Sequence, residues 1–150
     1  DYDLYIVFTV QEEVGLRGAR CAAYDIQPKF ALALDVTDTG DMPESEILMD
    51  AKLGSGAAIK IMDRSILCHP KMTQALQDIA KKRGIPYQNE VMTDGGTDAG
   101  EIHLARGGVI TGGISIPTRY IHSPCEVLDL RDIDAASRLL YAALAERIFF

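Results

Sequence analysis

Short apolar runs alternate along this chain with segments whose apolar residues recur at helical spacing. The first run, residues 4–10 (LYIVFTV), is apolar almost throughout, which is typical of a strand buried on both faces of a sheet. Further runs predict strands at 30–36, 57–62, 87–92 and 108–116. The run at 87–92 (YQNEVM) is more polar, so we expect it at an edge of the sheet.

Helical periodicity predicts helices between these strands. Pro70 opens one helix in the position that proline favours, and Gly84 ends it. Other helices are expected at 16–23, from the GGTDAG stretch to about Arg106, and at 132–148. This alternation is typical of an α/β fold with a mixed, largely parallel sheet sandwiched by helices.

The charge balance is acidic, because 22 Asp and Glu residues oppose 15 Lys and Arg residues for a net charge of −7. Nucleic acid is bound by clustered Lys and Arg, so this balance argues against such a partner. No apolar run approaches the roughly 20 residues of a membrane span, and we find no signal peptide. Three cysteines without a CxxC spacing suggest free thiols and a cytoplasmic location.

The chain opens at Asp1 without a methionine and runs at once into an apolar segment. Natural N-termini are usually looser than this. We therefore expect these residues to be one part of a longer protein.

Acidic residues follow the predicted strands at the ends where α/β proteins place their sites. Glu12 and Glu13 follow the first run, Asp35 ends the second, and His122 lies in the loop after the last. Carboxylate oxygens with an imidazole nitrogen suit Zn²⁺, Co²⁺ or Mn²⁺. Adjacent glutamates on an extended segment point in opposite directions, so one can bind a metal while the other faces water. Taken singly, each residue also suits a solvated turn, a cap or a surface loop.

Five stretches occur together in this order: TVQEEVGLRGA, ALDVTDTGD, AIKIMDRSILCHP, GGTDAGEIHLARGGV and IPTRYIHSPCEVLDLRD. Together they closely resemble the tetrahedral, glutamyl-type aminopeptidase family of co-catalytic dinuclear metallopeptidases. The resemblance covers nearly the whole chain and implies a zinc-aminopeptidase-like fold. Members of this family often carry the label endoglucanase or cellulase, which their ligand set does not support.

The resemblance implies a role for each matching residue. It makes Glu12 the general base, Glu13 and His122 ligands of one metal, and Asp35 a ligand of the other. It also implies two divalent ions, Zn or Co and possibly Mn, that activate water for hydrolysis of the N-terminal residue of short peptides. Intact members assemble as tetrahedral dodecamers, so a homo-oligomer is implied.

Two residues are secondary candidates for substrate contact. Asp98 belongs to the GGTDAG stretch, which by resemblance lines the active-site region, and Arg119 precedes the His122 loop. The alternative for the GGTDAG stretch is that Thr97 or Asp98 only caps the helix that follows.

The chain departs from the family pattern at its start. An early histidine and the aspartate that bridges both metals have no counterpart here, and neither Asp1 nor Asp3 is assigned as the bridge. We expect residues 1–150 to be the C-terminal part of a catalytic domain, without its upstream segment and its smaller inserted domain. A site with so few ligands predicts weak metal binding and no activity for the isolated chain.

Two other functions remain open at this point. One is a non-catalytic scaffold or assembly module with the same fold. The other is a glycoside hydrolase, which needs two carboxyls about 5–9.5 Å apart. Glu12 and Glu13 are adjacent and would diverge, and the chain has no tryptophan to stack on a sugar.

Overall fold

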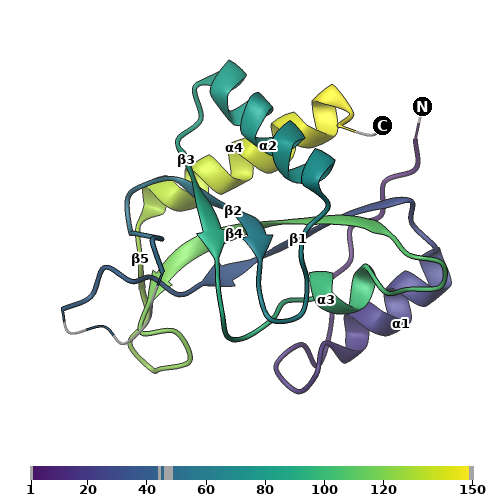
Figure 1. Cartoon of the computed structure of the whole chain (residues 1–150), viewed down its shortest axis with the longest axis horizontal. Helices are drawn as coiled ribbons and strands as arrows, with labels where there is room; N and C mark the ends of the chain where they lie inside the picture. The colour runs from purple at the N-terminus through teal and green to yellow at the C-terminus, as the bar shows by residue number, and fades with distance from the viewer. Residues whose placement is uncertain (1, 44, 46–48, 149–150) are drawn as a thin grey trace.

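The computed structural model describes residues 2–43, 45 and 49–148 (Figure 1). In chain order the elements are α1 (Arg17–Ile26), β1 (Phe30–Thr37), β2 (Ala57–Met62), α2 (Pro70–Arg83), β3 (Tyr87–Val91), α3 (Ala99–Ile102), β4 (Ile110–Arg119), β5 (Val127–Leu128) and α4 (Leu130–Glu146). No helix among these residues is long and apolar enough to cross a membrane.

The strands form a mixed sheet in the order β1-β4-β2-β3, with the short β5 paired to β4. β1 is parallel to β4 and β2 is parallel to β3, whereas the shorter β2–β4 and β4–β5 ladders are antiparallel. Asp35 lies opposite Ser115, and Lys60 lies opposite Glu90. Because alternate residues of a strand share a face, this register places all four side chains on one face of the sheet.

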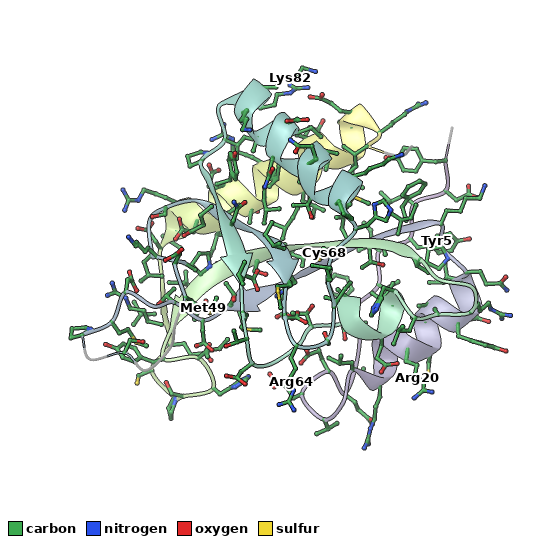
Figure 2. All side chains as sticks on the ribbon, viewed as in Figure 1. Tyr5, Arg20, Met49, Arg64, Cys68 and Lys82 are labelled. Atoms are coloured by element: carbon green, nitrogen blue, oxygen red, sulfur yellow. The ribbon has the colours of Figure 1, made fainter. Side chains whose placement is uncertain are left out.

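Helices cover both faces of the sheet, as the sequence predicts. α2 and α4 pack on one face, while α3 lies on the other with α1 outside it (Figure 1). The main core lies under α2 and α4, where the fully buried Met72, Leu76 and Leu139 meet Ile59 and Ile114 of the sheet. A smaller apolar cluster under α3 includes Cys68, in the interior of the molecule (Figure 2).

Local sequence signals define several elements closely. The helix predicted from Pro70 is α2, and it ends at Gly84, whose φ of 60° is one that glycine adopts easily. The strand predicted at 57–62 is β2, and β3 lies at the predicted edge. The three cysteines are free, with Cys68 buried and the other two exposed.

Residues 4–10 do not form the predicted buried strand. They run outside the sheet, with Ile6 75% and Phe8 92% exposed. Figure 2 shows Tyr5 of this segment at the periphery of the molecule. An apolar run forms a strand only where a neighbouring backbone pairs with it. In the sheet order of the described residues no strand pairs with this segment, so its composition alone cannot bury it.

Two further predictions need correction. The helix expected to reach Arg106 is the four-residue α3, because the chain continues from Ile102 in a series of turns and passes through Arg106 with a positive φ of 50°. Asp98 makes no capping hydrogen bond, and the buried hydroxyl of Thr97 has no hydrogen-bond partner among the described residues. β5 had no sequence signal, since two residues are too few for a periodic pattern.

Candidate active site

Five of the six predicted site residues, all except Arg119, lie near one another at the C-terminal end of β1. Glu12 is in electrostatic contact with Asp35, Glu13, Asp98 and His122. Asp35, Asp98 and His122 come from three segments that lie far from Glu12 in the sequence. The fold therefore brings together the residues that the sequence nominated one by one.

A tight turn before α1 presents the two glutamates. The carbonyl oxygen of Glu12 accepts hydrogen bonds from the backbone N–H groups of Gly15 and Leu16, at 3.1 and 2.9 Å. Leu16 takes a positive φ of 55°, which reverses the chain into the helix. Glu12 is thereby half-buried while Glu13 projects into solvent.

Glu13 and His122 form a direct pair. Glu13 Oε2 lies 3.2 Å from His122 Nε2, and both side chains are largely exposed, at 73% and 70%. The backbone N–H of His122 donates to Glu126 Oε1 at 2.7 Å, which anchors a residue whose φ is 60°. One oxygen and one nitrogen donor are thus presented side by side, as the resemblance implied for one metal.

Glu12 has an unusual proton affinity for a carboxyl. Burial raises its pKa to about 7, and the nearby Asp35, Glu13 and Asp98 carboxylates add to the rise, while His122 opposes it. A carboxyl that exchanges its proton near neutral pH has the property that a general base requires.

Asp35 occupies the end of β1, where the resemblance places a ligand of the second metal. Its Oδ1 accepts a hydrogen bond from the backbone N–H of Val36 at 2.8 Å. Burial is the main cause that raises the pKa of Asp35, with Asp98 adding to it, whereas the Val36 N–H and the charge of Lys60 lower it. A carboxylate in these surroundings is expensive to keep charged without a cation.

Asp98 faces the same acidic group and does not act as a helix cap. Its Oδ2 accepts a hydrogen bond from Thr9 Oγ1 at 2.6 Å, and its buried Oδ1 has no hydrogen-bond partner in the part of the chain that the structure describes. Thr9 lies three residues before Glu12, so this hydrogen bond ties the α3 side of the site to the segment that carries the glutamates.

Arg119 is engaged within the protein. Its Nε and Nη2 donate to the two oxygens of Asp41 at 2.9 and 2.7 Å. The structure thus gives this side chain a structural partner, and its predicted substrate contact stays a prediction.

Asp38 belongs to the same region and was not singled out from the sequence. Burial raises its pKa, and His122 is close enough to lower it. The sequence signal for Asp38 is its place as the second acid of the ALDVTD stretch, three residues after Asp35.

The donor set suits a divalent cation, although its geometry is incomplete. Within the part of the chain that the structure describes, no group of three His, Cys, Asp or Glu side chains could hold a metal ion. Glu13 and His122 are nevertheless paired, and Asp98 keeps a buried carboxylate oxygen without a partner. Oxygen and nitrogen donors of this kind fit Zn²⁺, Co²⁺ or Mn²⁺.

Comparison with known proteins decides the family. The model of the M42 glutamyl aminopeptidase family matches residues 1–139. The chain belongs to this family. The predicted resemblance is thereby confirmed.

Similar proteins agree with the family. The lysyl aminopeptidase of Pyrococcus furiosus is 42% identical over 145 residues, which cover 96% of this chain and 41% of that protein. An aminopeptidase from Desulfurococcus kamchatkensis has a similar structure, with a TM-score of 0.88 and 50% identity over 92% of this chain and 40% of its own. Some similar structures are named endoglucanase, a label that the resemblance to this family implied.

The TET1 peptidase of Pyrococcus horikoshii can assemble into a tetrahedron or a large octahedral shell. Its TM-score is 0.77 and its identity 36%, over 90% of this chain and 38% of its own. The M42 chain spans about two fifths of the length of the curated relatives that it matches.

Proposed function

We propose that this chain forms part of a metal-dependent aminopeptidase that removes the N-terminal residue of short peptides. The observation that carries the proposal is the Glu13–His122 pair beside Glu12, a carboxyl whose pKa burial raises to about 7. Family membership supports the same reaction class.

In the proposed reaction, some residues of this chain bind metal ions and one transfers a proton. Glu13 and His122 would hold one divalent ion, Zn, Co or Mn, and Asp35 would help to hold a second with ligands from outside residues 1–150. Such ions supply a Lewis acid that lowers the pKa of water toward about 7. Glu12 accepts the proton of the attacking water on its carboxylate and passes it to the leaving amine.

The proposal extends to the longer protein, its cellular location and its assembly. We infer that residues 1–150 are the C-terminal part of the catalytic domain, and that the isolated chain is inactive because it lacks further metal ligands. The intact protein would be a cytoplasmic homo-oligomer like the TET peptidases. Asp98 remains a candidate for substrate contact, and so does Arg119 if substrate can compete with Asp41.

Glycoside hydrolysis fits these residues poorly. Glu12 and Glu13 are adjacent, and Glu13 is directed toward His122 rather than toward a second carboxyl across a sugar-sized gap. We therefore propose peptide hydrolysis in place of the reaction that the endoglucanase name suggests.

Metal binding can be tested on the chain itself. Calorimetric titration with Zn²⁺ and Co²⁺ should detect binding that disappears in the double variant Glu13→Ala/His122→Ala. The matched control, Glu101→Ala/His103→Ala, removes the same residue types from α3 and its C-terminal cap and should leave binding unchanged. Equal binding by both double variants would contradict the proposed ligands.

Turnover can be tested in a chimera. These 150 residues would replace the matching stretch of the Desulfurococcus aminopeptidase, which is 50% identical and supplies the rest of the chain. We expect hydrolysis of peptide amides and none of cellulose-derived oligosaccharides. Glu12→Gln should lower kcat by about 10²–10⁴-fold with little change in metal content. A folded, metal-loaded chimera whose kcat is insensitive to Glu12→Gln would refute the assigned general base.

A further inference from the structure

A buried ionic cluster lies on the sheet face that α3 covers. The ammonium of Lys60 sits between the carboxylates of Glu90 and Asp63, and all three side chains are at most 1% exposed. Lys60 Nζ pairs directly with Glu90 Oε1 and lies 3.1 Å from Asp63 Oδ2. Burial lowers the pKa of Lys60, but the two carboxylates raise it by more, so the side chain stays an ammonium.

A glycine in the neighbouring strand makes room for this lysine. A Cβ atom at Gly113 of β4 would lie 3.0 Å from Lys60 Cβ and 3.2 Å from its Cδ. The aliphatic part of Lys60 therefore rests directly on the backbone of β4. This contact directs the ammonium along the sheet rather than toward solvent.

One branch of the cluster reaches the strand that carries Asp35. Glu90 Oε1 accepts a hydrogen bond from Thr37 Oγ1 at 3.0 Å, and both groups are buried. Thr37 lies two residues after Asp35 and points to the same face of β1. The position of the Asp35 end of β1 is thus coupled to the buried lysine.

The other branch reaches the glycine-rich turn that precedes α3. Asp63 Oδ1 accepts hydrogen bonds from the backbone N–H and the hydroxyl of Ser65, both at 2.7 Å. The Ser65 side chain lies under Gly96 and Gly100, where a Cβ atom would come within 3.0 and 2.3 Å of its oxygen. The backbone N–H of Arg64 also donates to the carbonyl of Gly95 at 3.2 Å.

This turn carries Asp98, whose hydrogen bond to Thr9 leads on to Glu12 and Glu13. A continuous set of contacts therefore runs from Lys60 to both sides of the acidic site. Its members act on the backbone that positions the carboxylates and lie outside the Glu13–His122 pair.

We propose that Lys60 is a positioning residue for the acidic site, because its buried ammonium holds the Asp35 end of β1 and the Asp98 turn in one fixed arrangement through Glu90 and Asp63. The inference rests on the proposed function insofar as these carboxylates serve a metal site. Carboxylates that lie close together repel one another. The backbone that carries them must therefore be fixed by contacts on the side away from the site. Buried ion pairs seldom add net stability over apolar side chains of similar size, which makes a geometric role the better reason for this one.

A charge-balanced double variant tests the role. Lys60→Met/Glu90→Gln removes both charges together, and Asp63 keeps its hydrogen bonds from the 65–66 backbone. The matched control is Lys82→Met/Glu146→Gln, the same substitutions in an exposed pair with Nζ 2.7 Å from Oε2. Amide hydrogen exchange of the whole chain and calorimetric Zn²⁺ titration are the two measurements.

We expect the N–H groups of Arg64 and Gly100, which hydrogen-bond in this region, to exchange about ten-fold faster in the double variant. Zn²⁺ affinity should fall about ten-fold, which is the usual effect of removing a group that orients a metal ligand without binding the metal itself. The β4 amides in the main core should keep their exchange rates, and the control should match the parent chain in both measurements.

Unchanged exchange at Arg64 and Gly100 in a folded double variant would overturn the proposal. If the double variant does not fold, Ser65→Ala replaces it, since it removes the hydroxyl that links Asp63 to the turn at Gly96 and Gly100, and unchanged exchange would again overturn the role. If the parent chain binds no Zn²⁺ but exchange accelerates as expected, the positioning role stands and the proposed metal site fails.

Discussion

Arg119 and Asp41 join the end of β4 to the irregular segment that follows β1. The guanidinium contacts both carboxylate oxygens, and the backbone N–H of Leu53 donates to Asp41 Oδ2 at 3.1 Å. The hydrogen bonds from Arg119 are the main cause that lowers the pKa of Asp41 from 3.8 to about 2. A sequence in which Arg119 stands beside a candidate ligand invites a substrate role, but the structure supplies an internal partner.

Stability should depend on pH through Asp41. Its folded-state pKa lies below its unfolded value, so its contribution is fully present above about pH 4 and is lost as the pH falls toward 2. Asp41→Asn should lower the free energy of unfolding at pH 7 by about 1 kcal/mol, a modest value because the pair is partly solvated. Urea denaturation at pH 7 and pH 2.5 measures the difference, which should be clearly smaller at the lower pH because part of the Asp41 contribution is already lost there.

The exposed Asp94 provides the comparison for this experiment. Asp94→Asn should change the unfolding free energy by less than about 0.5 kcal/mol at either pH. An Asp41→Asn effect of the same size at both pH values would mean that lost charge pairing is not its cause.

At the scale of elements, the first turn of α4 anchors the long loop that leads into β2. Asp132 is fully buried, and its two carboxylate oxygens accept hydrogen bonds from the backbone N–H groups of Gly54 and Gly56, both at 2.7 Å. Residues 49–56, which lead into β2, form no helix or strand, so these hydrogen bonds supply what regular structure would otherwise provide.

Removal of this anchor should be costly. Asp132→Ala leaves two N–H groups at a buried position without their acceptor and should lower the unfolding free energy by about 2–4 kcal/mol. Asp134→Ala, on the exposed side of the same helix, should cost less than about 0.5 kcal/mol. Thermal and urea denaturation of both variants give the comparison, and equal costs would show that the loop does not depend on Asp132.

Local patterns predicted most elements, and the failures share a cause. α2 and β2 follow from signals within their own residues: a proline, a glycine and a regular spacing of apolar side chains. The apolar segment 4–10 carries an equally strong pattern, yet its state depends on a pairing partner rather than on its own residues. α3 shortens because the chain must turn through Arg106 and Gly108 to enter β4.

At the scale of the whole molecule, segment 4–10 is an exposed apolar surface. Leu4, Tyr5, Ile6, Phe8 and Val10 are each more than half exposed. A segment outside the sheet with exposed apolar side chains readily associates with another chain. It also leads directly into Glu12 and Glu13, so whatever covers it affects the site.

The chain should therefore self-associate through this segment at micromolar concentrations. Phe8→Glu should shift the population toward monomer in sedimentation velocity experiments and leave the far-ultraviolet circular dichroism unchanged, because Phe8 is 92% exposed. Leu130→Glu, at a 77% exposed position on α4, is the control and should leave the association unchanged. A parent chain that sediments as a monomer would contradict the expectation.

The sequence by itself determined the α/β class, most helix and strand positions, the family, and the residues nominated for the site. These follow from local periodicity and from short motifs, whose information lies within a few neighbouring residues. Only the tertiary structure decided that Glu13 pairs with His122, that Arg119 is engaged by Asp41, and that Lys60 is buried between Glu90 and Asp63. Most of these partners are far apart in the chain. Lys60 and Glu90 meet because the β2–β3 register places them opposite each other, and the Glu13–His122 and Arg119–Asp41 pairs meet because the fold brings together loops and strand ends from distant parts of the sequence.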